Sequence, residues 1–361
     1  MEKRVLRKPD GRELILYSRR PIPEGIAATS PESAPSRPNP HLRWHPLRGE
    51  WVAYAEHRQD RTFMPEEGNP LAPTADSRRP TELPAGDYDV AVFGNLFPTF
   101  AETAHDPPLL PIPTRPARGV CEVVVFSRDP GATLGSLPLD RIELIIEVWA
   151  DRWRELGALD DVRYVFPFEN RGAEVGVTLS HPHGQIYAYP FVPPVAAREL
   201  ELQSAFLAEN GLGLLQTIVE EELERGGRHV VYEGKRVVAF VPLFARYSYE
   251  VWIAPRRAAA SLADLDAAER ADFARALKTV LLEYDGLWNR PFPYIASVHQ
   301  APTDGLPHPE AHVHVELYPA YRRSDRLKYL AGSEMGAGVF TADTLPEEKA
   351  EELRRVRVDV G

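Results

Sequence analysis

Residues 180–190 read SHPHGQIYAYP, and the pattern of this stretch decides the fold. His181 and His183 are separated by one proline and are followed by Gly184, Gln185 and alternating apolar residues. Such alternation predicts a strand, in which residues two apart project from the same face of a sheet. We therefore expect the side chains of His181, His183 and Gln185 to lie side by side.

A second stretch, AHVHVELYP, repeats this pattern with His312, His314 and Glu316. The elements around it repeat as well. Two strands, a long helix and two further strands are predicted within 88–190 and again within 235–319. The shared order and lengths predict a duplicated α+β fold, with antiparallel sheets and helices packed on one face. Chance similarity between two ordinary α/β stretches is the alternative.

Other segments frame these two passes. Hairpins are predicted at 4–18 and 42–55. Residues 21–40 are rich in Pro, Ser and Ala, which indicates an extended surface arm rather than a core element. A helical insert is predicted at about 195–226, and a C-terminal helix is expected to begin after Lys349. The predicted domains are an N-terminal repeat with its arm, residues 1–194, and the insert with the second repeat and C-terminal helix, residues 195–361.

The composition limits the class of partner. The chain has 361 residues, is 43% hydrophobic and carries a formal net charge of -11. This charge disfavours nucleic acid and anionic membranes as partners, although a local arginine cluster could still bind a small anionic substrate. A single cysteine, Cys121, excludes an intrachain disulfide. The charged N-terminus lacks a signal core and no segment is apolar enough to span a membrane, so a cytoplasmic protein is expected.

The HPHGQ segment contains the residue types that phosphoryl or nucleotidyl transfer requires. A neutral imidazole is a good nucleophile towards phosphorus when a hydrogen bond at the other ring nitrogen fixes its tautomer. His183 is the expected nucleophile, Gly184 would let the backbone approach phosphate oxygens, and Gln185 would donate to a phosphoryl oxygen. Packed core histidines or a zinc site are alternative interpretations.

The same segment, preceded by FENRGAEVGVT, resembles the active-site strand of the galactose-1-phosphate uridylyltransferases, a family with two fused histidine-triad repeats. LRWHPLRGEWVAYAEHRQDR and RLKYLAGSEM also resemble family segments, so the resemblance covers most of the chain. Hydrolases of the superfamily carry a third histidine where this chain has Gln185. The resemblance implies a ping-pong reaction in which His183 takes UMP from UDP-glucose and passes it to galactose 1-phosphate, with the carbonyl of His181 orienting the His183 ring.

The resemblance also implies binding residues. For Arg58 and Arg61 the alternative is a pair of solvated surface side chains, and for Asn170 it is a plain turn residue. Nucleotide and phosphate contacts are matched by Arg58, Arg61, Asn95, Asn170, Gly176 and Thr178. Sugar-phosphate contacts, which in the family reach the neighbouring subunit's site, are matched by Lys328, Tyr329, Ser333 and Glu334. These last matches imply a homodimer with shared active sites. One further glutamine of the family is not evident near Phe340, and Leu96 stands where an acidic residue is common.

Two metal sites are implied by the resemblance. The first, a structural zinc site with two cysteines, is expected to be absent because only His181 of its ligands is kept and Pro130 occupies another ligand position. The second uses a glutamate and three histidines. Two histidines and two carboxylates would suit Zn or Fe(II), with His312 as a possible substitute ligand. A salt-bridged seam between the insert and the second repeat is the alternative. The residues matched to the second site are Glu199, His299, His314 and Glu316.

Two other functions stay open at this point. One is an adenylyl transferase or phosphorylase of the same superfamily, acting on ADP-glucose or a dinucleoside polyphosphate. The other is a non-catalytic protein that binds a nucleotide or a metal. The shape of the base pocket would distinguish the adenylyl transferase from a uridylyl transferase. Failure to form a covalent adduct would favour the non-catalytic protein.

Overall fold

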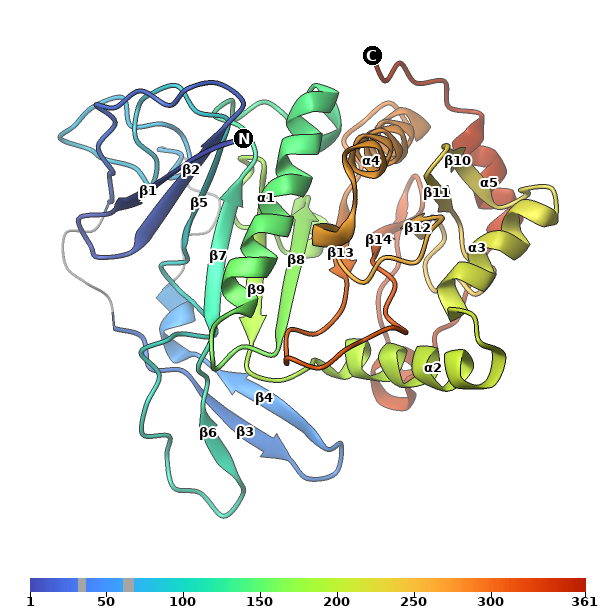
Figure 1. Ribbon diagram of the computed structural model, residues 1–361, viewed down its shortest axis with the longest axis horizontal. Helices are drawn as coiled ribbons and strands as arrows, with labels where there is room; N and C mark the ends of the chain where they lie inside the picture. The colour runs from blue at the N-terminus through green and yellow to red at the C-terminus, as the bar shows by residue number, and fades with distance from the viewer. Residues whose placement is uncertain (32–36, 61–67) are drawn as a thin grey trace.

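An antiparallel sheet of 11 strands runs through the molecule (Figure 1). The computed structural model describes residues 1–31, 37–60 and 68–361. The strands of the sheet are β1 (Glu2–Arg7), β2 (Glu13–Ser18), β5 (Val90–Gly94), β7 (Val120–Val125), β8 (Tyr164–Arg171), β9 (His183–Tyr189), β10 (Val230–Glu233), β11 (Val237–Phe240), β12 (Val251–Pro255), β13 (Tyr294–His299) and β14 (His314–Pro319). Their spatial order is β1-β2-β5-β7-β9-β8-β13-β14-β12-β11-β10.

This order confirms the predicted duplication. The first repeat contributes β5-β7-β9-β8 and the second contributes β11-β12-β14-β13, each counted from its outer strand towards the centre. The two central strands, β8 and β13, pair with each other, with Tyr294 opposite Arg171 and Ser297 opposite Phe168. One sheet and one apolar core therefore extend through both repeats. The division into two domains at 194/195 stays a prediction.

Helices α1 (Leu139–Gly157) and α4 (Ala267–Leu287) cover one face of the sheet, one helix for each repeat (Figure 1). In α1 the buried side chains Ile142, Ile145 and Trp149 recur at three- to four-residue spacing, which places them on one stripe. The predicted packing of the repeat helices is confirmed. The C-terminal helix α5 (Pro346–Arg354) packs beside α4, and it begins earlier than predicted because proline is well tolerated in the first turn.

The insert differs from the repeat helices, because α2 (Pro194–Asn210) and α3 (Leu214–Glu224) cover the opposite face of the sheet. Leu215 and Val219 of α3 pack against Phe240 and Ala254 in a cluster separate from the main core. Neighbouring residues on the same strands point the other way, into the core beneath α4. The second repeat is therefore covered on both faces.

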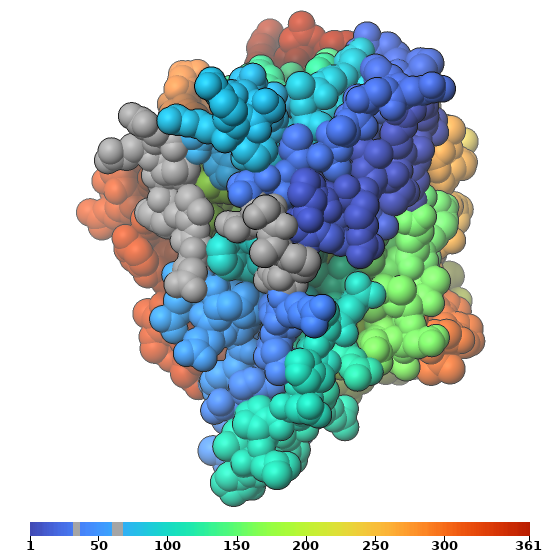
Figure 2. Space-filling model, turned by 90° about the vertical axis from the view of Figure 1, so that its left-hand side faces the viewer, coloured from blue at the N-terminus to red at the C-terminus, as the bar shows by residue number. Residues whose placement is uncertain are grey.

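Two smaller groups of elements complete the fold. A three-stranded sheet in the order β4-β3-β6 packs on the face of β9 that is opposite α1, and it forms the lower projection in Figure 2. The predicted hairpins at 4–18 and 42–55 are both confirmed. The remaining short elements are β3 (His41–His45), β4 (Glu50–Tyr54), β6 (Thr114–Pro116), β15 (Tyr321–Arg323), β16 (Arg326–Leu327), the 3₁₀ turns η1 (Glu56–Asp60), η2 (Leu134–Ser136), η3 (Ala173–Val175) and η4 (Leu262–Asp264), and the π-helical turn η5 (Gly332–Ala337).

The segment predicted to be a surface arm is in part a core element, so that prediction was wrong. Ile22 and Ile26 are buried in a cluster with Leu14 and Leu83 on the face opposite α1. A proline-rich composition indicates the absence of regular structure, but it does not prevent single apolar side chains from being buried. Among the described residues, no helix combines the length and apolar character needed to cross a bilayer.

Candidate active site

His183 is the first residue of β9 and lies on the face of the sheet opposite α1, because Ile186 and Ala188 of the same strand point into the core. Its Nδ1–H donates to the carbonyl of His181 over 2.7 Å. Burial lowers the pKa of His183 more than this hydrogen bond raises it, which favours the neutral ring at pH 7. With Nδ1 engaged, Nε2 carries the lone pair available for attack.

His183 lines a cavity of about 130 Å³. Arg58 and Thr178 also line a larger neighbouring cavity of about 940 Å³, so the two spaces adjoin. The structure therefore brings together most of the predicted nucleotide and phosphate contacts around one imidazole. The residues lining the smaller cavity are Arg58, Phe168, Asn170, Gly176, Val177, Thr178, His183, Gly184, Gln185 and Tyr187.

Arg58 and Asn95 are held by contacts with the main chain near the cavity. The Nη1 group of Arg58, on η1, donates to the carbonyl of Phe97 over 2.7 Å. The side-chain oxygen of Asn95 accepts from the Phe97 amide over 2.9 Å, and its Nδ2 lies 3.4 Å from Oε1 of Gln185. The Asn95 contact orients the Gln185 amide so that its NH₂ group is available to a ligand. Arg61 lies outside the described residues.

Gly184 contributes backbone to the cavity, but its lack of a side chain has a packing reason that the sequence did not indicate. A Cβ atom at this position would lie 2.7 Å from Cζ of Phe126 and 2.9 Å from the carbonyl oxygen of Phe168. The expectation that Gly184 lets the backbone approach phosphate oxygens is therefore incomplete. The glycine also allows β9 to pack closely against these two groups.

His181 is 1% exposed, and both of its ring nitrogens are hydrogen-bonded. Nε2 lies 2.7 Å from the carbonyl of Ser127, and Nδ1 lies 2.9 Å from Nδ2 of Asn69. Burial lowers the pKa of His181, so the ring is neutral at pH 7. The contact with Asn69 was not predicted. Asn69 belongs to an irregular, proline-rich stretch 112 residues earlier, where local pattern gives no indication of the contact.

The predicted sugar-phosphate contacts form a separate exposed loop after β16. Lys328 donates through Nζ to the carbonyl of Thr341 over 2.7 Å, and Ser333 donates to the carbonyl of Val339 over 2.7 Å. Glu334 accepts from the Thr341 hydroxyl over 2.9 Å, whereas Tyr329 is 76% exposed. None of the four lines the cavity at His183 in the same chain. The structure of one chain therefore does not bring them to the nucleophile.

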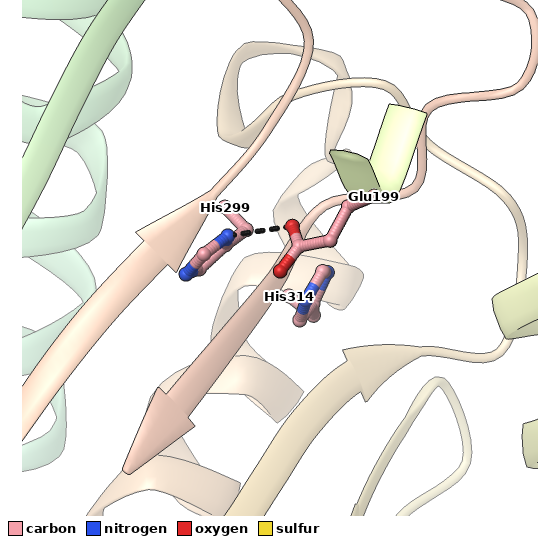
Figure 3. Close-up of side chains that lie close together, drawn as sticks. All are labelled: Glu199, His299 and His314. Carbon is pink, nitrogen blue, oxygen red and sulfur yellow. Dashed lines mark hydrogen bonds and ion pairs between the residues drawn. The ribbon is translucent and has the colours of Figure 1, made fainter. Parts of the chain in front are cut away.

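Three of the four predicted metal ligands meet between α2, β13 and β14. Glu199, His299 and His314 each offer a ligand atom, and these atoms lie within 4.8 Å of one another (Figure 3). Oε2 of Glu199 lies 2.8 Å from Nδ1 of His299. The two histidine rings are stacked with centroids 5.1 Å apart. This group could hold one metal ion.

Glu316 lies beside this group but is not within it. Its carboxylate oxygens lie 3.4 Å from Nε2 of His314 and 3.7 Å from Nε2 of His299. Burial opposes charge at these sites, but the mutual attraction is stronger, so the pKa of His314 is raised and that of Glu316 is lowered. Nε2 of His314 and Oε1 of Glu316 are buried without a hydrogen-bond partner in the described chain. Such unsatisfied acceptors fit a metal ion, and a proton shared by the pair is the alternative.

The substitute ligand considered from the sequence, His312, has a different environment. Its Nε2 lies 2.9 Å from the carbonyl of Pro255, and it lines a small cavity with Glu199, His299 and His314. Burial lowers the pKa of His312 to about 4, which keeps its ring neutral. It is not a member of the three-residue group described above.

Known proteins are similar to most of the chain. The family model described as galactose-1-phosphate uridyl transferase, N-terminal domain, matches residues 32–193, and the model of the C-terminal domain matches residues 199–360. A galactose-1-phosphate uridylyltransferase from Thermotoga maritima is 37% identical over 328 residues, covering 88% of this chain and 99% of that protein.

Two solved structures are informative about the fold. A uridylyltransferase structure superposes with a TM-score of 0.78 at 34% identity, covering 88% of this chain and 98% of that chain. An ADP-glucose phosphorylase from Arabidopsis thaliana, with bound ADP-glucose, has a TM-score of 0.66 at 23% identity, covering 89% of this chain and 100% of that chain. The second likeness concerns the fold alone.

Proposed function

Since the chain belongs to the galactose-1-phosphate uridylyltransferase family, we propose that it moves UMP from UDP-glucose to galactose 1-phosphate through a covalent uridylyl group on His183. The observation that carries this mechanism is the 2.7 Å hydrogen bond from Nδ1 of His183 to the carbonyl of His181. It leaves a neutral ring with its Nε2 lone pair beside a cavity whose lining includes Arg58, Asn170 and Thr178, which the family resemblance assigns to nucleotide and phosphate binding.

In the first half-reaction, the Nε2 lone pair of His183 attacks the α-phosphorus of UDP-glucose. A P–N bond forms while the bond from the α-phosphorus to the bridging oxygen breaks, and the electron pair leaves with glucose 1-phosphate. The ring gains positive charge, which the carbonyl of His181 stabilises through the proton on Nδ1. No proton has to be transferred in this step.

The second half-reaction reverses these changes with another acceptor. A phosphate oxygen of galactose 1-phosphate attacks the α-phosphorus, the P–N bond breaks and the electron pair returns to Nε2 of His183. Gln185 would donate to the same phosphoryl oxygen in both directions. Because its amide is neutral, Gln185 is a poor base towards water, and this would protect the covalent intermediate from hydrolysis.

The remaining cavity residues would bind the nucleotide and its phosphates. Arg58 supplies a guanidinium, and Asn170 and Thr178 supply an amide and a hydroxyl on the same cavity wall. Gly176 has a φ of 79°, a left-handed conformation that glycine adopts readily, at the bend of the loop before β9. Asn95 would act partly through Gln185. We assign Arg61 to the same function from the family resemblance.

We also propose a homodimer in which the loop containing Lys328, Tyr329, Ser333 and Glu334 completes the active site of the neighbouring subunit. Two features of the loop support this assignment: it lines no part of its own chain's cavity, and it exposes Tyr329 to solvent. Hydrogen bonds from Lys328 and Ser333 to main-chain carbonyls keep the loop compact. A defined loop of this kind could dock without first having to fold.

A single Zn or Fe(II) ion, held by Glu199, His299 and His314, is the cofactor that these residues fit best. When bound, the ion would act as a cross-link and not as a reactant, because the proposed nucleophile belongs to the other repeat. Two features would keep the site in place: Glu316 offsets positive charge beside the histidines, and α2 brings Glu199 to the sheet.

The test is incubation with UDP-glucose in the absence of an acceptor, followed by intact-protein mass spectrometry at mildly alkaline pH. We expect a mass gain of one uridylyl group that is absent in His183→Ala and is lost when galactose 1-phosphate is added. A gain with ADP-glucose but not with UDP-glucose would support the adenylyl alternative. No gain with either nucleotide sugar, in a folded protein, would mean that the resemblance to the family is one of fold only and would favour the non-catalytic alternative.

A further inference from the structure

Asn69 contacts the catalytic strand from a distant part of the chain. It follows η1 in sequence and precedes a loop whose Leu71 and Leu83 are buried against β2 and β5. Its Nδ2 lies 2.9 Å from Nδ1 of His181. We propose that Asn69 is a positioning residue for the reaction proposed above: it holds His181, whose carbonyl in turn orients the nucleophile His183.

The orientation of the Asn69 amide follows from its second contact. Its oxygen, Oδ1, accepts a hydrogen bond from the main-chain N–H of Leu71 over 3.0 Å. An amide has one acceptor end and one donor end, so the NH₂ group must face His181. Asn69 therefore donates to Nδ1 of His181, and that nitrogen carries no proton.

This donor and the carbonyl of Ser127 together determine the tautomer of His181. Because Nδ1 accepts, the ring proton is on Nε2, which donates to the carbonyl of Ser127 over 2.7 Å. The ring is thus held at both ends, by Asn69 from the loop and by Ser127 from the segment after β7. The main-chain carbonyl of His181 accepts from Nδ1 of His183 over 2.7 Å. Any rotation or displacement of residue 181 would change the direction of that carbonyl and hence the aim of Nε2 of His183.

The second repeat provides an internal comparison. His312 occupies the place of His181, and its Nε2 lies 2.9 Å from the carbonyl of Pro255. The ring of His314 likewise contacts the carbonyl of His312 over 2.9 Å. However, Nδ1 of His312 is buried without a hydrogen-bond partner in the described chain. In the second repeat, His314 therefore contacts the carbonyl of His312 although His312 has no amide partner. Among the described residues, an amide such as that of Asn69 holds the first histidine only in the repeat that carries the proposed nucleophile.

Two substitutions separate the donor from the other properties of Asn69. Asn69→Asp keeps the oxygen that accepts from Leu71 but replaces the donor with a second acceptor. Asn69→Leu removes the donor without adding charge, at the expense of the Leu71 contact. The loss of the N–H donor is the one change they share. For both variants we expect the single-turnover rate of uridylylation to fall about 10- to 100-fold, with little change in the UDP-glucose concentration needed for half the maximal rate.

Thr74→Val is the matched control within the same loop. Its hydroxyl lies 2.8 Å from the carbonyl of Leu83 and 3.0 Å from the hydroxyl of Thr81, but it makes no contact with His181. This variant loosens the loop and leaves the donor in place, so the uridylylation rate should stay near that of the wild type. A similar loss in Thr74→Val and in the Asn69 variants would show that loop packing alone is responsible and would overturn the proposal.

The spectroscopic test is ¹⁵N NMR of labelled histidine, which distinguishes protonated from unprotonated ring nitrogens. The wild type should contain His181 protonated only on Nε2. In Asn69→Asp the new acceptor should also bring a proton to Nδ1, whereas in Asn69→Leu the carbonyl of Ser127 keeps the proton on Nε2 and only the shift caused by the hydrogen bond at Nδ1 should be lost. An adduct that forms as fast in the Asn69 variants as in the wild type overturns the role of Asn69 alone. No adduct in the wild type overturns the proposed function, and the positioning role with it.

Discussion

The two His-x-His strands share a geometry but differ in surroundings. In both, the second histidine contacts the carbonyl of the first, over 2.7 Å at His183 and 2.9 Å at His314. In both, Nε2 of the first histidine lies next to a main-chain carbonyl. The strand pattern therefore places the second ring against the carbonyl of the first histidine in both repeats, and only the first repeat adds the contact from Asn69. The difference in chemistry must come from what surrounds the ring.

Two differences stand out. Gln185 follows the first ring and Glu316 follows the second, so a neutral donor is replaced by an anion on the same face. The first ring lines a cavity with Arg58, whereas the second lies beneath α2 and Glu199. One repeat thus presents its imidazole to an anionic ligand, and the other surrounds it with carboxylates that suit a cation or a proton.

The largest expected effect comes from removing the two histidines in turn. His183→Ala should lower the rate of UMP transfer by at least about 10⁴-fold, because the proposed nucleophile is lost. His314→Ala should lower it less than about tenfold, since that ring is on the other repeat. Steady-state assays of UMP transfer with both purified variants measure the ratio of their rates to that of the wild type. Equal losses of transfer rate in the two variants would contradict the assignment of the nucleophile to the first repeat alone.

Exchanging the amide and the carboxylate tests the second difference. Gln185→Glu places an anion beside the phosphoryl oxygens and removes a donor, and we expect a loss of about 10²- to 10³-fold in uridylylation rate. Glu316→Gln removes an anion far from the cavity and should change that rate by less than about threefold. Quenched-flow measurement of adduct formation compares the uridylylation rates of the two variants. An active Gln185→Glu protein would exclude the proposed donor role.

Metal binding is expected to affect stability more than catalysis. If an ion joins α2 to the sheet, its removal by a chelator should lower Tm by about 5 °C, which corresponds to roughly 4 kcal/mol for a chain of this size. Glu199→Gln should reproduce the lower Tm and abolish the chelator effect. Elemental analysis and calorimetry provide the two measurements. An unchanged Tm and no bound metal would favour the salt-bridged seam.

The smallest expected effect is on pH dependence. Nucleophilic attack requires the neutral form of His183, and burial holds its pKa below the ordinary value of 6.5. The neutral fraction is therefore kept as the pH falls through 6.5, and the rate of adduct formation should drop only at lower pH. A single-turnover pH profile in saturating UDP-glucose measures this. A midpoint above pH 6.5 would contradict the described environment of the ring.

The duplicated pattern explains why so much of the fold was predictable. Alternation around His183 and His314 identified both strands and the shared face, and three- to four-residue spacing identified α1 and α4. Which face α2 and α3 would cover was not predictable. An amphipathic helix reveals that it buries one side, but both faces of the sheet offer apolar partners.

The site was predictable only where its residues belong to a recognisable segment. His183, Gln185, Asn170 and Thr178 belong to one continuous stretch with a clear pattern, and the structure brings them to one cavity. Asn69 belongs to an irregular loop whose place against the sheet depends on Leu71 and Leu83. Contacts made by such loops follow from tertiary packing, which local periodicity does not encode.

The pairing of β8 with β13 has a consequence for how the two halves can exist. Tyr294 donates to Glu169 over 2.8 Å and Arg171 pairs with Asp285 over 2.8 Å, so polar side chains also cross this junction. A chain ending near residue 193 would leave β8 as an open edge strand with unpaired N–H and C=O groups and exposed apolar surface. An open edge strand can pair with the edge of another chain, which leads to aggregation. The half that carries His183 should therefore be insoluble when expressed alone, and solubility should return on co-expression with the other half.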